Sequence, residues 1–221
     1  MSAFVRWGFA VLLAVVALGL GVAVLQIPDI GGGLSAPVMT RLSETGVEHP
    51  VTAVLLNYPG YATLLEMVVL LLALLGAWGL SDSADELPVP PAGAVLDQLV
   101  GFLVPVLVLV AAYLLWVGAY SPGGAFQGGA VLAGAGVLLS LVEPGWRQQR
   151  FAGIAELLLL PGVAVFVLVG IASMVSGGRF LEYPVDAAGA LILLIEGFAM
   201  LSIAVTLHTL FAGTARVGVD Q

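Results

Sequence analysis

Hydrophobic residues fall into six long, nearly uninterrupted runs along the chain, separated by polar or glycine- and proline-rich breaks. The runs cover about residues 5–25, 60–80, 98–118, 124–142, 155–176 and 187–210. A helix needs roughly 20 apolar residues to cross the hydrocarbon core of a bilayer, and each run is about that long. The runs are continuous rather than alternating, which argues against a β-barrel. We therefore expect an all-α integral membrane protein with about six transmembrane helices, two followed by four.

Two of the breaks are long enough to shape the organisation of the chain. The first, residues 26–59, ends in the apolar piece 51–56, which is too short to span and which we interpret as a short strand or an interfacial segment. The second, residues 81–97, is acidic and contains the sequence PVPP, which is typical of an exposed linker. We accordingly expect a two-helix element over residues 1–80, a linker over 81–97 and a four-helix domain over 98–221.

Composition and charge narrow the function classes. The chain is 61% hydrophobic and 9% charged, more apolar than a soluble domain of 221 residues can hide. It has no cysteine and two histidines, so we expect no disulfide, no thiolate or histidine metal centre and no cofactor. The net charge of −8 argues against nucleic-acid binding.

The first run also resembles the core of a signal peptide, with Arg6 before it and a small-residue stretch at 21–23. It is longer than a usual signal core, and we expect an uncleaved helix. Arginine bias favours a cytoplasmic N-terminus and C-terminus. In that orientation Arg41 and Arg179 lie outside, and the cytoplasmic arginines are Arg6, Arg147, Arg150 and Arg216.

Ionisable side chains within the apolar runs are the first candidates for chemistry, because a charge inside a membrane is costly. Glu66 and Glu196 lie within the second and last runs, and we expect both to face the interior of the bundle. Desolvation favours the neutral form of a carboxyl group, so such a group can hold or pass a proton near neutrality. Each can equally be a protonated, purely structural link between helices. Glu156 and His208 stand near helix ends and are weaker candidates for the same path, with an interfacial or packing role favoured for both.

The break at residues 121–129 reads SPGGAFQGG and joins the third and fourth runs. Small residues four apart, as in Gly124 and Gly128, Gly129 and Ala133, or Ala130 and Gly134, allow helices to pack closely. It is not a phosphate loop, because no lysine exists to complete one. We interpret the break as a helix-packing motif made of Pro122, Gly123, Gly124, Phe126, Gln127, Gly128 and Gly129.

This motif, with the alanine-rich run that follows it, resembles the signature of the B subunit of Mrp-type (Mnh-type) sodium/proton antiporters. Residues 177–184 (GGRFLEYP) are similar to the loop before the last helix in that family. The resemblance covers about residues 97–212. It implies an accessory subunit of a multisubunit Na⁺/H⁺ antiporter in a prokaryotic plasma membrane, with other membrane subunits as partners and Na⁺ and H⁺ as the transported ions.

Residues 44–66 are similar to the C-terminal end of the large A subunit of these antiporters, which is a separate small subunit in membrane-bound hydrogenases. The chain thus resembles a fusion of that element with a B-type subunit, joined by the acidic linker. Two alternatives stay open. The chain could be a membrane module of a redox-driven complex, such as a hydrogenase or a relative of respiratory complex I, or a purely structural scaffold.

The chain also departs from the family pattern. The family usually has arginine where Pro59 stands and aspartate where Ala62 stands, so a charge pair is missing here. It usually has a histidine in the turn near Ala119 or Tyr120, and an aspartate where Glu196 stands. The last change keeps the acid and moves it outward by one methylene. These departures indicate a divergent branch.

Overall fold

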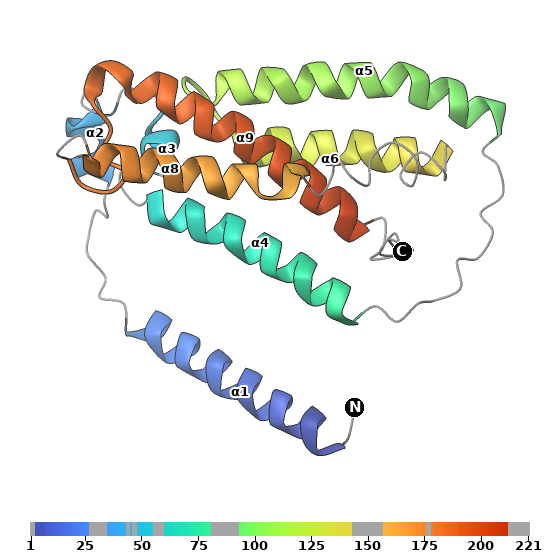
Figure 1. Cartoon of the computed structure of the whole chain (residues 1–221), viewed down its shortest axis with the longest axis horizontal. Helices are drawn as coiled ribbons and strands as arrows, with labels where there is room; N and C mark the ends of the chain where they lie inside the picture. The colour runs from blue at the N-terminus through green and yellow to red at the C-terminus, as the bar shows by residue number, and fades with distance from the viewer. Residues whose placement is uncertain are drawn as a thin grey trace. The chain divides into compact units, whose positions relative to one another are not determined.

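The computed structural model of the chain describes residues 3–26, 35–42, 45, 48–54, 60–80, 93–142, 157–175 and 178–211, and every structural statement below concerns these residues. They form helices and connecting turns, and the described ranges contain no strand, which confirms the all-α class. The helices are α1 (Ala3–Leu25), α2 (Ser35–Thr40), α3 (Pro50–Thr52), α4 (Gly60–Leu80), α5 (Ala94–Val117), α6 (Ala125–Val142), α8 (Pro161–Val175) and α9 (Val185–Phe211) (Figure 1).

The six apolar runs correspond to the six longest of these helices. Four helices, α4, α5, α6 and α9, are long and apolar enough to cross a membrane, and shorter apolar helices cover Val11–Leu25 and Pro161–Val175. The fifth run was expected over 155–176, and its described helix α8 is shorter. Several residues singled out in the sequence lie outside the described residues. They are the acidic linker up to residue 92, Glu156, and Arg147, Arg150 and Arg216, which were expected in the cytoplasm.

The chain divides into two compact units at a place the sequence did not predict. Residues Met1–Pro37 form one unit and Val38–Gln221 the other, so α4 belongs with α5, α6, α8 and α9 rather than with α1. Residues 94–97, expected to end the linker, already form the first turn of α5. The reason is packing, because α4 contacts both α8 and α9.

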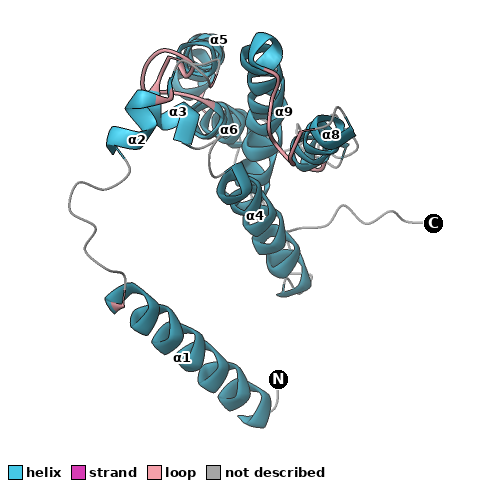
Figure 2. Cartoon of the chain, turned by 90° about the vertical axis from the view of Figure 1, so that its left-hand side faces the viewer, coloured by secondary structure: helices cyan, strands magenta, loops and turns pink. Residues whose placement is uncertain are grey.

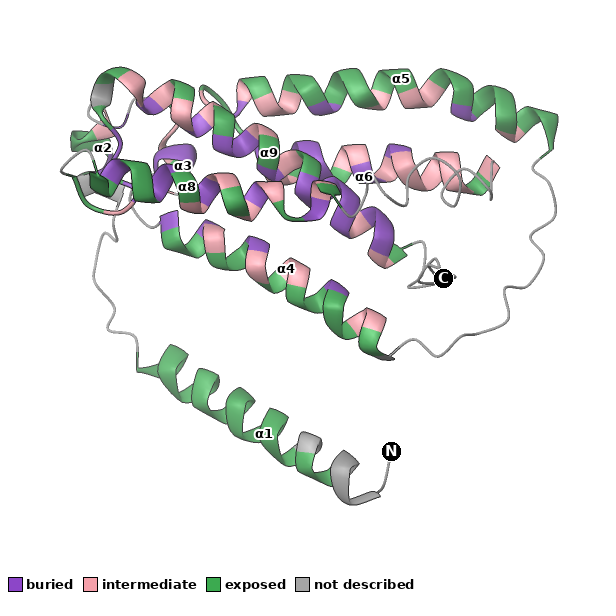
Figure 3. Cartoon of the chain, viewed as in Figure 1, coloured by how far each residue is buried: buried purple, intermediate pink, exposed green. Residues whose placement is uncertain are grey.

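Helix α9 is the centre of the second unit. It contacts α4, α5, α6 and α8, and Figure 3 shows buried residues along most of its length, whereas α5 is largely exposed. Its buried side chains Ile192, Ile195, Ala199 and Ile203 recur every three or four residues and pack into one core with Phe166 of α8. This spacing places them on one face of the helix.

The apolar piece 51–56 is helical where the structure describes it, so the expectation of a strand was wrong. Residues 50–52 form α3, and the helical turn continues through Val54. Pro50 favours this start because its ring fixes φ near the helical value and its missing N–H is not needed at the first helical position. Figure 2 shows α3 beside the ends of α5 and α6.

Candidate functional site

The glycine break turns the chain sharply between α5 and α6. The N–H of Gly124 donates a hydrogen bond of 2.8 Å to the carbonyl of Leu114, in the last turns of α5. Gly124 has φ +109°, a value that side-chain-bearing residues rarely adopt. A Cβ atom added at Gly123 would lie only 2.5 Å from the Leu114 oxygen. The turn can close this tightly only because both positions are glycine.

Glu196 of α9 reaches into this turn. Its side chain is 6% exposed, and the backbone N–H of Ala125, the first residue of α6, donates a hydrogen bond to its carboxylate. A Cβ atom at Gly124 would lie 2.8 Å from Oε1 of Glu196. The unpaired N–H groups and positive dipole end of a helix N-terminus stabilise a carboxylate. The glycine break therefore makes room for Glu196 at the start of α6.

A third segment, residues 48–54, is attached to the same turn by hydrogen bonds. The N–H groups of Glu48 and His49 both donate to the carbonyl of Ala119, at 3.0 and 2.9 Å. The buried hydroxyl of Thr52 donates to the carbonyl of Gly118. These bonds join positions about 70 residues apart in sequence, and they hold the segment against the end of α5.

Replacing Thr52 with Val tests this attachment, because valine keeps the shape of threonine and lacks the hydroxyl. The Gly118 carbonyl would lose its donor in a buried place, at an expected cost of about 1–3 kcal/mol. The melting temperature of the purified full chain in detergent should fall. Ser121→Ala, which removes an exposed hydroxyl from the same turn, is the control and should leave the melting temperature nearly unchanged. Equal melting temperatures for both variants would contradict the attachment.

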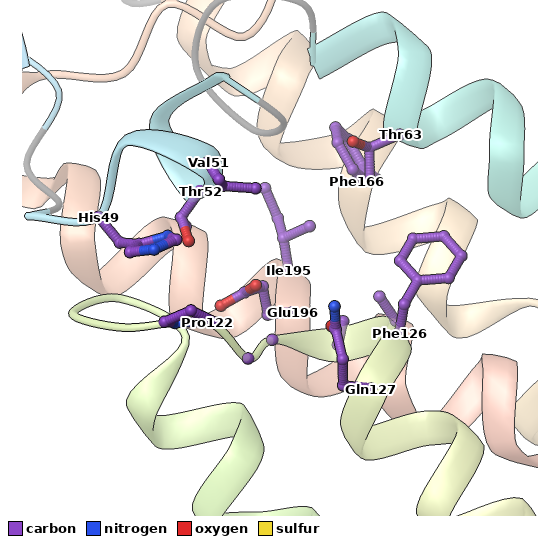
Figure 4. A pocket seen from close by; sticks show the side chains of 14 residues that line it. His49, Val51, Thr52, Thr63, Pro122, Phe126, Gln127, Phe166, Ile195 and Glu196 are labelled. Atoms are coloured by element: carbon purple, nitrogen blue, oxygen red, sulfur yellow. The ribbon is translucent and has the colours of Figure 1, made fainter. Parts of the chain in front are cut away.

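Glu196 borders a cavity of about 190 Å³ between the turn, α9 and the 48–54 segment (Figure 4). We call it the His49 cavity. Its polar side chains come from four parts of the fold, the 48–54 segment, α4, α6 and α9, and apolar side chains such as Phe126, Phe166 and Ile195 close the rest. The polar side chains that line it are His49, Thr52, Thr63, Gln127 and Glu196.

His49 is the residue that the sequence did not identify. Its Nδ1 atom is buried and has no hydrogen-bond partner within the described part of the chain. Figure 4 shows its ring and the Glu196 carboxylate on the wall of the same cavity. The one signal was the missing family histidine near Ala119, since the backbone of His49 bonds to that residue. Its position beside Glu196 could not be predicted, because the two residues are far apart along the chain.

Glu66 is not where we expected it. Thr63, Met67 and Leu74 form the buried face of α4, and Glu66 stands beside this face with its side chain exposed. The expectation that it faces the interior of this bundle was wrong. The structure does not bring Glu66 together with Glu196, because only Thr63 of α4 lines the His49 cavity.

His208 is buried and packs against α6. A Cβ atom at Gly136 would lie 3.0 Å from its Nδ1, and its Nε2 lies 3.4 Å from the hydroxyl of Ser140. His208 is twelve residues beyond Glu196 on α9, about 18 Å along the axis. It lines a different, mostly apolar cavity, so the two are not brought together.

Only some of the small residues spaced four apart on α6 lie at its contact with α9. Gly128, Gly129 and Ala133 are buried on α6, and added Cβ atoms at the two glycines would meet Met200 and Ile203 of α9 at 2.8 and 2.9 Å. The Ala130 and Gly134 pair makes no such contact, since Ala130 is exposed and nothing lies within 4 Å of a Cβ at Gly134. Of the rest of the motif, Phe126 packs against the core and Gln127 lines the His49 cavity.

The described residues include no group of three or more His, Asp or Glu side chains that could hold a metal ion. Within the described part of the chain, the arrangement offers instead one buried carboxyl group at a helix break, next to a cavity that polar side chains line in part. With four apolar helices of spanning length, these features define a polytopic membrane protein.

Residues 95–216, more than half of the chain, match the family model described as a domain related to the MnhB subunit of Na⁺/H⁺ antiporter. The chain belongs to this family, which confirms the resemblance of its C-terminal part to the antiporter B subunit. No curated protein matches the sequence.

Two solved structures share the fold. One is the Mrp complex from Dietzia sp. DQ12-45-1b, with 23% identity and a TM-score of 0.66 over 100% of this chain. This chain spans only 27% of the length of the Dietzia chain. The other is the membrane-bound sulfane sulfur reductase, an archaeal respiratory membrane complex, with 24% identity and a TM-score of 0.55 over 94% of this chain and 98% of that one.

Proposed function

We propose that this chain is an accessory membrane subunit of a multisubunit monovalent cation (Na⁺)/proton antiporter, and that Glu196 lies on its ion or proton path. The observation that carries the proposal is the buried Glu196 carboxyl group at the N-terminus of α6, beside a cavity that polar side chains line in part. Intramembrane carboxyl groups of this kind mark ion and proton routes. Membership of the antiporter subunit family supports the same assignment.

The assembly, rather than this chain alone, would carry out transport. The match to the Mrp complex runs over the whole of this chain and about a quarter of its counterpart, which supports a place within a larger complex. It also supports the proposal that residues 1–80 resemble the end of the antiporter A subunit. Part of any transport path would then be built by partner chains.

The outward position of Glu66 supports a partner beside α4. A carboxylate within an apolar span is costly to leave in lipid, and such groups face protein or water. Since Glu66 does not point into this bundle, we propose that it meets a neighbouring subunit, where it contributes to the path. Glu156, which lies outside the described residues, and His208 remain weaker candidates, the latter because it is engaged with α6.

Glu196→Gln tests the proposal in membrane vesicles that contain the complete complex. Gln keeps the size and hydrogen bonding of Glu but can neither ionise nor release a proton. Sodium-dependent proton movement should fall at least about tenfold, a change of about 1.4 kcal/mol in the barrier. Glu66→Gln should lower it as well. Glu182→Gln, in the exposed loop before α9, is the control and should leave exchange unchanged.

Co-purification of the other subunits with each variant shows whether the complex still assembles. Unchanged exchange in the double variant Glu66→Gln, Glu196→Gln, with assembly intact, would contradict the role of both carboxyl groups. That result would favour a purely structural subunit.

A second candidate function follows from the other structural match. The sulfane sulfur reductase chain is matched over nearly its full length, so this chain could equally be a membrane module of a redox-driven complex. Its electron-transfer centres would lie in partner chains. Partners that co-purify with metal-binding cysteine clusters would favour this candidate, and antiporter-like membrane partners would favour the first.

A further inference from the structure

Glu196 borders a second cavity as well as the His49 cavity. This second cavity, of about 290 Å³, is lined by Glu48, Ala119, Tyr120 and Glu196, together with Trp116 and small or apolar residues of α9. We call it the Glu48 cavity. Glu48 and Tyr120 are exposed, so this cavity reaches the surface of the described chain. Among the described residues, Glu196 is the one that lines both cavities.

The segment that carries Glu48 and His49 contributes one of these two residues to the wall of each cavity. The backbone at His49 is extended, with φ −88° and ψ 124°, and successive side chains of an extended segment point to opposite sides. Both N–H groups bond to the Ala119 carbonyl, which fixes the segment in this orientation. As a result Glu48 lines one cavity and His49 the other, with Glu196 between them.

We propose that Glu196 passes protons between the Glu48 cavity and the His49 cavity, with Glu48 and His49 as the proton-exchanging groups on its two sides. The proposal rests on the proposed function, in which Glu196 lies on the path. It adds the transported species at this site, the proton, and two groups that carry it.

The transfer needs only water and the side chains present. The Glu196 carboxyl gives its proton to a water in the His49 cavity, and that water gives one of its protons to the imidazole ring of neutral His49. The products are the Glu196 carboxylate and a His49 imidazolium. The step consumes no water and changes no oxidation state. A proton from the Glu48 side then restores the carboxyl group. A water occupies about 30 Å³ of liquid volume, so each cavity has room for several waters.

The titratable side chains on the walls suit a proton. His49 and Glu196 line the His49 cavity, Glu48 and Glu196 line the Glu48 cavity, and each of these groups can take up and release a proton. In the described chain the only other titratable side chain on either cavity wall is Tyr120, since α4, α6 and α8 contribute neutral groups.

Two measurements on His49→Asn, Glu48→Gln and the double variant test this relay. The first follows the infrared C=O band of Glu196, identified by its loss in Glu196→Gln, as the purified full chain is mixed with D₂O. Either cavity alone can exchange the carboxyl proton, so each single variant should change the rate less than about twofold. The double variant should slow exchange at least about tenfold, within the range for a lost proton-transfer group.

The second measurement is proton movement by the complete complex in vesicles. Transport must use both cavities, so each single variant should reduce it at least about tenfold. The exchange measurement does not depend on antiport, so it separates failure of the relay from failure of the proposed function. His49→Gln replaces His49→Asn if the latter does not fold, as judged by circular dichroism.

Unchanged exchange in the folded double variant would overturn the relay. The relay would also be overturned if the complex exchanges cations for protons and either folded single variant keeps full transport. Added imidazole should restore transport in His49→Ala and not in Glu196→Gln, because a small base can enter the cavity and replace the ring. If imidazole does not restore transport in a folded and assembled His49→Ala complex, that result counts against a proton-carrying role for His49.

Discussion

Replacing Gly124 with Ala is expected to destabilise the chain by about 2–6 kcal/mol and to displace Glu196 from the start of α6. Two costs add. A side-chain-bearing residue held at φ +109° is strained by about 1–3 kcal/mol. The new methyl group would also lie 2.8 Å from Oε1 of Glu196. Such overpacking costs about a further 1–3 kcal/mol. Relief requires the carboxylate to leave the Ala125 N–H.

The measurement is the free energy of unfolding of the purified full chain in mixed micelles, together with proton movement by the complete complex. Gly134→Ala is the matched control on α6, because nothing lies within 4 Å of the added Cβ. It should be neutral or slightly stabilising, since Ala is the better helix former. If Gly124→Ala were as stable as Gly134→Ala, the turn would not depend on glycine at position 124.

Replacing Gly129 with Val should separate α6 from α9. A Cβ atom there would lie 2.9 Å from Cγ2 of Ile203 and 3.1 Å from the carbonyl oxygen of Met200. The second contact is with backbone, so a change of rotamer cannot relieve it, and valine adds two further methyl groups. We expect a loss of at least about 3 kcal/mol, at the upper end of overpacking costs.

Gly134→Val is the control for this change, because it places the same β-branched side chain on the same helix without a close neighbour. The difference between the two unfolding free energies isolates the contact with α9 from the helix propensity of valine. A difference below about 0.5 kcal/mol, the size of an ordinary surface effect, would mean that Gly129 does not set the distance between the helices.

The helices themselves were predictable because their signal is local. The length of an apolar run and the glycine or proline residues at its ends predicted α4, α5, α6 and α9 to within a few residues. The short piece 51–56 was ambiguous, since a brief apolar run suits a strand as well as a helix. Its helical form depends on Pro50 and on the bond from Thr52 to Gly118, a pairing that no local pattern contains.

The facing of side chains within the membrane helices was harder to predict. Apart from Thr63 and Glu66, helix α4 is apolar around its circumference, so no polar stripe indicates which face packs inward. Small or flexible residues, Thr63 and Met67, form its inner face, and Glu66 falls beside them. The prediction was right for Glu196 because α9 is surrounded by other helices, so most of its faces are interior. His49 required knowledge of the contact with Ala119.

The central position of α9 has a consequence for how the protein is made. Helices α5 and α6 contact each other across the short glycine turn, so they can pair as soon as both have left the ribosome. Helix α4 contacts α8 and α9, which are both synthesised after it, and α8 contacts α9, which follows α8 in the chain. The second unit therefore completes its packing only after the last helix is synthesised. Until then α4 lacks its contacts with α9.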